Sequence, residues 1–564
     1  MSQDPKIGVF ICKCSGETGA SVRCADLASF AAGLQGVKEV QTHQAYCVPP
    51  GLEEIRKAIA AKGLDRIVVA GCSPRTHEAL FRKALSEANL NPYMLEVVNI
   101  RDHAAAVAAS EDAATSQARR MLKIGVARAE KLAPLKNACV RPEKRVVVIG
   151  AGLVGLSAAK QLLARGFTVL AVEKSDAAGG RLGRHFTMLP GPHKTDDFLK
   201  RLVDGLYQNP AMEFMFGAEV TSLQGCTGAY GVTVRDRSGE KKVSAGAVVV
   251  AVGAEEFSPE GLFGFNGRDV ITQTGLESLL KQGLDLPKGS IAMIQCAGGR
   301  SASVPYCSRT CCMTALKNAL WIKAQQPSTE VSIIFRDIYT GGPIQERDIR
   351  TAAEKGVKFY RYQEGNPPRV EREDEESVFP PLKVIVHDIL TNAKKELACD
   401  LVVLSNPLVP GQDSLKLAHI LRIPTDQYGF LIDHYARVKP SHLVEKGIFV
   451  CGDAHFPLSP YEGQIQAYGT ASRIARLLTR DELEGNAFYS EVDESKCIAC
   501  GLCEGICTYG AIRVIQDEKG KKARSFAVNC LGCGTCAAGC PMKAIGMWHF
   551  TDGQISSQIV AAAS

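Results

Sequence analysis

Residues 145–173 read RVVVIGAGLVGLSAAKQLLARGFTVLAVE, and this stretch decides the fold of the middle of the chain. A buried strand is predicted at residues 145–149, a glycine-rich turn and a helix follow, and a second strand at residues 167–172 ends in Glu173. This order is typical of the dinucleotide-binding unit of a parallel α/β sheet. The middle of the chain is therefore predicted to be a Rossmann-type domain.

The glycines of this turn explain how the unit would bind a phosphate. Gly150 permits the tight turn, Gly152 lets the backbone approach a pyrophosphate, and Gly155 allows the helix to pack closely. The helix N-terminus then faces the phosphates, because its free N–H groups and its dipole favour an anion. Glu173 is placed to bind a ribose hydroxyl. The fingerprint alone does not distinguish FAD from NAD.

A later stretch favours FAD. Residues 447–453, Gly-Ile-Phe-Val-Cys-Gly-Asp, resemble the closing FAD motif of flavoproteins with two dinucleotide domains. Asp453 would then bond the ribityl or phosphate region of the flavin, whereas an ordinary turn aspartate is the alternative interpretation. The other residues predicted to bind this cofactor are Lys174, Gly180, Arg181, Gly253 and Gly452.

A second glycine fingerprint, expected after the strand at residues 290–295 in an NAD(P)H-binding half, is replaced by cysteines. Cys296 follows that strand, and residues 305–312 open a predicted helix that continues to about residue 323. Cys307 and Cys311 are expected one turn apart on this helix, next to Cys312, so four thiolates can meet at its N-terminus. Four small buried residues packing a degenerate Rossmann half is the other interpretation.

The C-terminal segment contains the spacing C-x2-C-x2-C-x3-C twice. The runs are Cys497, Cys500, Cys503, Cys507 and Cys530, Cys533, Cys536, Cys540. In bacterial ferredoxins each run gives three ligands to one [4Fe-4S] cluster and its fourth cysteine to the other. We therefore assign Cys497, Cys500, Cys503 and Cys540 to one cluster and Cys530, Cys533, Cys536 and Cys507 to the second. A pair of zinc ribbons fits this spacing poorly.

Residues 6–100 alternate apolar strands with helical stretches, which predicts a small parallel α/β domain. Strands are expected at residues 7–11, 66–70 and 94–98, with a further candidate at residues 43–46. Four cysteines lie near strand ends, where ligands bind in parallel sheets; they are Cys12, Cys14, Cys47 and Cys72. They can converge on a cluster, and inert thiols brought together by chance are the alternative.

Composition narrows the class of protein. The 564 residues include 21 cysteines, and no apolar segment follows the polar start, so metal or redox use is favoured over disulfides. A net charge of +6 from 66 basic and 60 acidic residues does not indicate nucleic-acid binding. No stretch approaches the roughly 20 apolar residues of a membrane span, and we expect a cytoplasmic protein. Five isolated cysteines are expected to be packed thiols; they are Cys24, Cys139, Cys226, Cys399 and Cys451.

Residues 306–319, YCSRTCCMTALKNA, resemble the signature of the A subunit of heterodisulfide reductase. The resemblance extends to Cys12-Lys-Cys14, to GCSPRTHE at residues 71–78 and to HFTDGQI at residues 549–555, so it covers nearly the whole chain. It implies an α/β fold with a thioredoxin-reductase-like FAD domain made of Rossmann-type halves, an N-terminal α/β cluster domain and a C-terminal bacterial 2[4Fe-4S] ferredoxin domain.

The resemblance also implies the cofactors and domains. One FAD and four [4Fe-4S] clusters are expected, with the four cysteines from Cys296 and the four from Cys12 each holding one. A lysine matching Lys317 would approach the reactive edge of the flavin, although a helix lysine taken alone would be solvated. The expected domains are residues 1–135, residues 140–482 with a degenerate nicotinamide-type half at 288–400, residues 486–548, and a docking tail at 549–564.

The implied function is electron transfer within a larger complex, and three versions stay open. The chain would pass electrons between heterodisulfide-reductase B/C-like subunits and a small [2Fe-2S] hydrogenase-delta-type subunit, with ferredoxin as a further partner and a homodimer as its assembly. It would bifurcate or confurcate electrons, or act as a one-electron conduit in a quinone-linked or benzoyl-CoA-reductase-type complex, or oxidise NAD(P)H. The direct passage from Gly180 to Phe198, where many relatives carry an inserted ferredoxin domain, favours the conduit.

Overall fold

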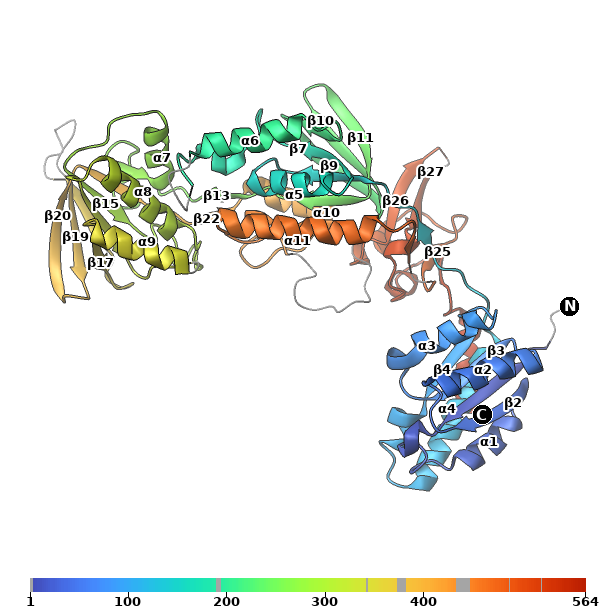
Figure 1. Cartoon of the computed structure of the whole chain (residues 1–564). Helices are drawn as coiled ribbons and strands as arrows, with labels where there is room; N and C mark the ends of the chain where they lie inside the picture. The colour runs from blue at the N-terminus through green and yellow to red at the C-terminus, as the bar shows by residue number, and fades with distance from the viewer. Residues whose placement is uncertain are drawn as a thin grey trace. The chain divides into compact units, whose positions relative to one another are not determined.

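The computed structural model describes residues 4–188, 194–340, 343–372, 382–432, 447–485, 487–518 and 520–564. These residues form two compact units (Figure 1). The first unit joins Met1–Cys139 to Glu484–Ser564, and the second is Val140–Leu483. The N-terminal domain and the C-terminal cysteine runs therefore belong to the same unit.

The N-terminal domain is a four-stranded parallel sheet, in the order β2-β1-β3-β4, with helices on both faces. Side chains alternate along β1, so Val9 and Ile11 pack with α1 and α4 while Phe10 packs with α2 and α3. The elements are β1 Ile7–Cys12, α1 Cys24–Ala32, β2 Val37–His43, α2 Pro49–Lys62, β3 Arg66–Gly71, α3 Pro74–Glu87, β4 Leu95–Asn99 and α4 Glu111–Glu130.

The predicted strand at residues 43–46 is wrong, because β2 ends at His43. The register pairs His43 with Cys12, the last residue of β1, so both strands stop together. The chain then turns tightly into α2, and a Cβ atom at Gly51 would lie only 2.4 Å from Ala45 O.

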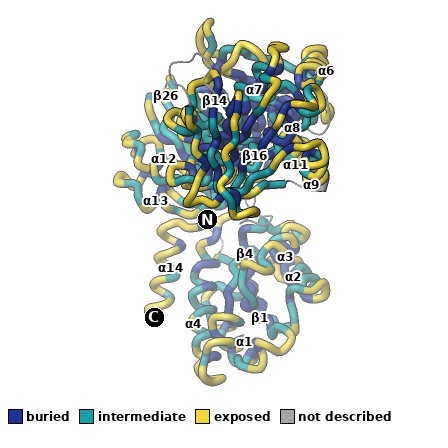
Figure 2. The backbone as a smooth tube through the Cα atoms, turned by 90° about the vertical axis from the view of Figure 1, so that its left-hand side faces the viewer, coloured by how far each residue is buried: buried dark blue, intermediate teal, exposed yellow. Residues whose placement is uncertain are grey.

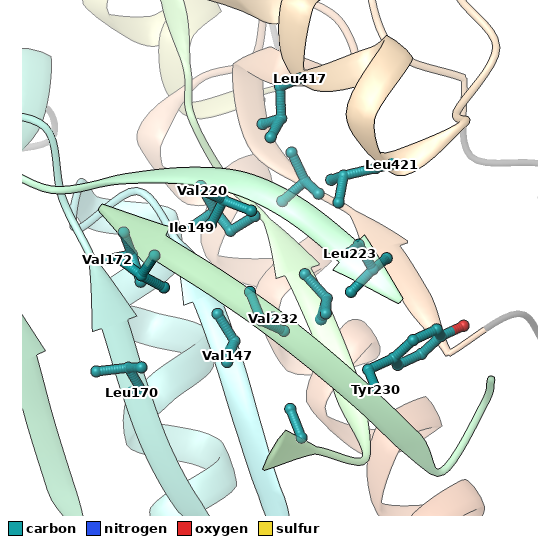
Figure 3. Close-up of a cluster of buried hydrophobic side chains, with 14 of the residues drawn as sticks. Val147, Ile149, Leu170, Val172, Val220, Leu223, Tyr230, Val232, Leu417 and Leu421 are labelled. Carbon is teal, nitrogen blue, oxygen red and sulfur yellow. The ribbon is translucent and has the colours of Figure 1, made fainter. Parts of the chain in front are cut away.

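The second unit begins with a parallel sheet in the order β23-β12-β6-β7-β8. Helices α5 and α11 cover one face, where Ala467 packs with Val148. The other face packs on the antiparallel strands β9, β10 and β11 and on α10, around Val147, Val232 and Leu421 (Figure 3). The elements are β6 Arg145–Ile149, α5 Leu153–Leu163, β7 Thr168–Val172, α6 Thr195–Tyr207, β8 Met212–Met215, β9 Glu219–Cys226, β10 Ala229–Asp236, β11 Gly239–Ala245, β12 Ala247–Val250, α10 Gln412–Leu421, β23 Ile448–Val450 and α11 Pro460–Leu478.

A second parallel sheet, β14-β21-β15-β16-β17, repeats this plan in the same unit. Helix α8 packs on it through Leu316 and Ile322, which contact a core containing Met293 and Ile333. The elements are β13 Ala254–Glu256, β14 Val270–Thr272, α7 Gln273–Lys281, β15 Ser290–Ile294, α8 Cys311–Gln325, β16 Glu330–Phe335, α9 Pro343–Glu354, β17 Lys358–Arg361, β18 Arg369–Arg372, β19 Leu382–Asp388, β20 Ala393–Cys399, β21 Leu401–Leu404 and β22 Leu408–Pro410.

The C-terminal segment folds as two similar halves, each with a short helix inside its cysteine run. Its core is made largely of cysteines, since Cys497, Cys503 and Cys536 pack with Ile512 and Ile545. The elements are β25 Ser490–Val492, α12 Leu502–Ile506, β26 Ile512–Asp517, β27 Gly520–Ser525, α13 Thr535–Ala538 and β28 Ile545–Met547.

The tail helix, α14 Asp552–Ala563, packs beside α4 of the N-terminal domain (Figure 2). Gln554 is buried and donates a hydrogen bond from Nε2 to Lys131 O at 3.1 Å. The outward face contains Ile555, Ile559 and Val560, which are 43%, 63% and 66% exposed. This helix therefore turns apolar side chains away from the domain it packs on.

A search for membrane-spanning helices gave none: within the described ranges, every helix is too short or too polar to cross a bilayer.

Candidate cofactor sites

The glycine turn between β6 and α5 leaves room for a phosphate group. A Cβ atom at Gly150 would lie 2.4 Å from Ala251 O, and one at Gly155 would lie 2.0 Å from Gly150 O. At Gly152 the nearest atom would be 3.9 Å away, on Gly180, so the backbone at the start of the helix stays open. This arrangement fits a pyrophosphate held at a helix N-terminus.

Glu173 ends β7 beside this turn. Its carboxylate accepts hydrogen bonds from Ala151 N at 2.7 Å and from Ser175 N at 2.9 Å. Because the side chain is also buried, its orientation against the glycine turn is fixed. The position suits a contact with a ribose hydroxyl, which stays a prediction.

Asp453 lies at the same edge of the sheet, between β23 and α11. It accepts hydrogen bonds from Leu458 N at 2.8 Å and from Arg181 Nη2 at 2.8 Å. A Cβ atom at the neighbouring Gly452 would lie 3.1 Å from Val154 on α5. The structure thus brings Arg181, Gly452 and Asp453 to the glycine turn.

Two other predicted cofactor residues lie at the rim of this edge. Gly253 follows β12 with a φ of 77° and has no atom within 4 Å of its Cβ position. Lys174 is exposed and forms an ion pair at 3.3 Å with Asp413 on α10. The geometry therefore brings Gly253 toward the open space, whereas the Lys174 ammonium is held by α10.

The loop after β15 is closed where the loop after β6 is open. A Cβ atom at Gly298 would lie 2.5 Å from the ring of Phe257, and one at Gly299 would lie 3.3 Å from Pro407. Cys296 adopts a left-handed φ of 60°, which turns the chain sharply after the strand. Side chains fill the space that a dinucleotide phosphate would need.

Four thiols meet near the start of α8 instead. The pKa of Cys296 is raised to about 11, first by burial and then by the neighbouring Cys312 and Cys307 thiols. A hydrogen bond with Cys312, followed by burial, raises the pKa of Cys311. Buried thiols that raise one another's pKa suit a bound cation, because metal coordination deprotonates a thiol.

The predicted placement of Cys307 on a helix with Cys311 is wrong. Helix α8 begins at Cys311, and Arg309 has a φ of 61°, in the left-handed region that an α-helix excludes. Ser308 Oγ also accepts a hydrogen bond from Leu408 N at 2.6 Å, which ties the segment to β22. Cys307 therefore joins the other thiols from an exposed loop.

Lys317 is buried rather than solvated. Its ammonium forms an ion pair with Glu277 on α7 and donates a hydrogen bond to Thr187 O at 2.8 Å. The fully buried Glu277 accepts a hydrogen bond from Phe186 N at 2.6 Å, and His185 Nδ1 lies 3.7 Å from its carboxylate. Burial lowers the pKa of Lys317. Although burial opposes it, contact with His185 and Lys317 brings the pKa of Glu277 to about 2.

The first C-terminal thiol set lines a single pocket with an empty volume of about 360 Å³. The pocket contains all the cysteines of the crossed assignment, Cys497, Cys500, Cys503 and Cys540. Backbone amides already point at two of these sulfurs, from Ala499 N to Cys497 Sγ at 3.4 Å and from Ala544 N to Cys540 Sγ at 3.3 Å. The space and the donors fit an iron-sulfur cluster.

The second set repeats this arrangement. Gly532 N donates to Cys530 Sγ at 3.4 Å and Ala511 N donates to Cys507 Sγ at 3.3 Å, at the same offsets along the chain as in the first set. Burial raises the pKa of Cys536, and the Cys530 and Cys507 thiols add to this effect. Cys533 is exposed. Cys507 thus lies with the second run, as the crossed assignment requires.

The N-terminal cysteines gather at the carboxyl edge of the sheet, where the strand order reverses between β1 and β3. Cys14 Sγ lies 3.4 Å from Cys72 Sγ, and Tyr46 N donates to Cys12 Sγ at 3.5 Å. Burial raises the pKa of Cys47, with further contributions from Cys12 and Cys72. The hydrogen bond with Cys14 is the main cause that lowers the pKa of Cys12 to about 6. Such a reversal point is where parallel sheets bind ligands.

The isolated cysteines divide into two kinds. Cys24, Cys226, Cys399 and Cys451 are buried, as predicted, but Cys139 is exposed and the prediction is wrong for it, because it lies where the chain leaves the first unit. Among the described residues, no three His, Cys, Asp or Glu side chains surround one point closely enough for a single metal ion. A [4Fe-4S] cluster instead spreads its four cysteine ligands over separate irons.

Three charged residues beside these sites were not predicted. Glu277 and His185 lie at Lys317, and Arg101 donates from Nη1 to Cys72 Sγ at 3.7 Å. For Glu277 the sequence did hold a signal, because its spacing places it on the apolar helix face of Leu280. The other two contacts arise from distant segments and leave no local pattern.

Comparisons with known proteins agree with this architecture. The family model described as pyridine nucleotide-disulphide oxidoreductase matches residues 144–294, and that of the 4Fe-4S dicluster domain matches residues 490–547. These matches confirm the predicted flavoprotein-type and dicluster domains.

Two curated proteins are similar over most of the chain. The iron-sulfur A subunit of CoB–CoM heterodisulfide reductase from Methanocaldococcus jannaschii is 30% identical over 91% of this chain and 92% of its own. Its counterpart numbered 1 in Methanopyrus kandleri is 30% identical over 99% of this chain and 98% of its own. Among solved structures, Lactococcus lactis thioredoxin reductase is 18% identical over 59% of this chain and 99% of its own, with a TM-score of 0.41.

Proposed function

Because the chain belongs to the family of the iron-sulfur A subunit of CoB–CoM heterodisulfide reductase, we propose that it carries electrons between partner proteins through one FAD and four [4Fe-4S] clusters. The chain is an oxidoreductase of flavoprotein and dicluster type. FAD supplies the exchange between one- and two-electron carriers, and each cluster passes one electron. The protein's own task is to hold these groups and set their potentials.

The observation that carries this proposal is the exchange of a nucleotide site for thiols. In the second sheet Phe257 and Pro407 fill the loop after β15, and the thiols of Cys296, Cys307, Cys311 and Cys312 meet beside it. A flavin in the first half would therefore face a cluster rather than a nicotinamide. This favours electron exchange with proteins and argues against an NAD(P)H oxidoreductase.

Lys317 would place a positive charge at the reactive edge of the flavin. Glu277 and Thr187 fix its ammonium on α8, and a cation there stabilises a flavin that gains negative charge. Glu277 would then act as a positioning residue, because it holds the lysine in place.

Partner binding would use the tail and the ferredoxin-type segment. The outward apolar face of α14 supports docking of a small [2Fe-2S] subunit, since an exposed apolar patch marks an interaction site. Heterodisulfide-reductase B/C-like subunits would exchange electrons elsewhere on the chain, and ferredoxin and a second copy of the chain are further candidates. A one-electron conduit is our preferred version over bifurcation, because the segment from Gly180 to Phe198 is short.

An anaerobic reductive titration of the purified, cluster-loaded protein tests this function. A conduit predicts that the flavin absorbance bleaches in two separate one-electron steps, whereas bifurcation predicts one two-electron step. NADH and NADPH should leave the flavin oxidised, and direct reduction by either would contradict the proposal. Iron analysis should give four clusters per chain, and the paired change Cys311→Ser with Cys312→Ser should remove one.

A further inference from the structure

One buried amide beside the proposed cluster of α8 has no role in the fold. Gln295 follows β15 and is 0% exposed, yet neither its Nε2 nor its Oε1 has a hydrogen-bond partner in the described residues. An unsatisfied buried amide is costly, and native proteins rarely keep one without a function.

The backbone around this residue is held firmly. Gln295 N donates to Ile334 O at 2.8 Å, and Gln295 O accepts from Tyr362 Oη at 3.0 Å. The main chain is therefore satisfied and fixed on both sides, and only the side-chain amide is left without a partner.

The cavity that contains this amide offers it a single polar neighbour. Gln295 and Cys312 line a cavity with an empty volume of about 200 Å³, together with the apolar residues Leu316, Ile333, Ile338, Ile349 and Phe359. A thiol accepts hydrogen bonds weakly, whereas a thiolate bound to iron carries negative charge and accepts them well. Cys312 is one of the four thiols that would hold the cluster.

We propose that the Gln295 side-chain amide donates an N–H···S hydrogen bond to the iron-bound sulfur of Cys312 and raises the reduction potential of this cluster. Hydrogen bonds to cluster sulfurs are one of the means by which a protein sets that potential. A donor stabilises the reduced cluster, which carries one more negative charge. Arg300 and Arg336 act on the neighbouring Cys296 in the same direction, because their charges favour its ionised form. This inference rests on the cluster of the proposed function.

The test is the midpoint potential of each cluster, measured by anaerobic EPR titration of the loaded chain. Gln295→Met keeps the length of the side chain but removes the donor, and it should move the potential of one cluster to a more negative value. Gln295→Glu keeps the shape and replaces the donor with a carboxylate, so its shift should have the same sign and be larger. Ile349→Leu, which changes the same cavity without a polar group, should leave all potentials in place.

The signal is assigned with the Cys311→Ser, Cys312→Ser double variant, which should lose this cluster and no other. An unchanged potential in Gln295→Met with full iron content would overturn the inference and leave the proposed function intact. If the cysteine variant kept all its iron, both the cluster and the hydrogen bond would be wrong. Loss of iron in both Gln295 variants would show that the amide holds the cluster rather than tunes it, and would also overturn the inference.

Discussion

At the scale of single residues, the pair of Glu277 and Lys317 places two charges inside the second unit. Burying them is costly, and the attraction between them, with hydrogen bonds to Phe186 N and Thr187 O, offsets that cost. Such a pair holds one geometry, because either charge alone would be left unpaired. This makes it suited to present a charge at a fixed place.

Removing one partner of this pair should destabilise the protein strongly. We expect Glu277→Gln to lower the free energy of unfolding by about 3–5 kcal/mol, because Lys317 would stay buried without its partner. Adding Lys317→Met should restore much of the loss. The exposed pair of Lys358 and Glu330 is the control, and Glu330→Gln should cost only about 0.2–1 kcal/mol. Denaturant unfolding measures all three changes, and similar costs for the two glutamates would contradict this account.

The glycine turn makes a second prediction at this scale. Gly155→Ala would bring a Cβ atom to 2.0 Å from Gly150 O, so the backbone must shift and flavin retention should fall. We expect a loss of about 1–3 kcal/mol, the usual cost of overpacking. Gly469→Ala on the exposed side of α11 has no atom within 4 Å and should instead gain about 0.5–1 kcal/mol. Thermal unfolding and flavin absorbance after gel filtration separate the two outcomes.

At the scale of elements, sequence patterns predicted the repeating units well. The β6-α5-β7 unit was predictable because its glycines, its apolar strands and Glu173 follow one another within a short stretch. The start of α8 was not, because Arg309 leaves helical geometry through contacts with a distant strand, and these leave no local signal. The end of β2 was also missed, since its length is set by pairing with β1.

The tail helix makes a prediction at this scale. Replacing Ile555 and Ile559 with serine should leave stability within about 0.5 kcal/mol, because both side chains are exposed. Binding to a purified small [2Fe-2S] subunit should fall at least tenfold if α14 docks it. Leu390→Ser, which removes an exposed leucine in the second unit, is the matched control. Equal binding by the double variant and the wild type in calorimetry would refute docking through this face.

At the scale of the molecule, the first unit is held together by contacts that sequence reasoning did not foresee. His549 stacks on Phe488 with ring centroids 4.5 Å apart, and Arg128 donates to His549 O at 2.9 Å while it pairs with Glu96. Arg82 lies over the ring of Phe488. These residues come from opposite ends of the chain, so no local pattern could have linked them.

This contact predicts a pH dependence. Burial, with Arg128 and Arg82 nearby, lowers the pKa of His549 to about 3 from an ordinary 6.5. The unfolded chain therefore binds a proton that the folded one excludes, and stability falls as pH drops below 6.5. One pH unit below that value, the loss from this group is about 1.4 kcal/mol.

His549→Phe keeps an aromatic ring on Phe488 without the titration. The wild type should lose stability relative to this variant between pH 7.5 and pH 5.5, in unfolding measured by circular dichroism on the cluster-loaded chain. Parallel pH curves for the two proteins would rule out His549 as the source.

The crossed cysteines of the C-terminal segment have a consequence for how the protein ages in air. Cys500 and Cys533 are exposed, one in each proposed cluster, so oxidants reach both centres from solvent. Each run also lends its fourth cysteine to its neighbour, and decay of either centre would slacken the anchor of the survivor. Stored preparations should therefore divide into intact and fully bleached molecules, with few half-damaged chains between them.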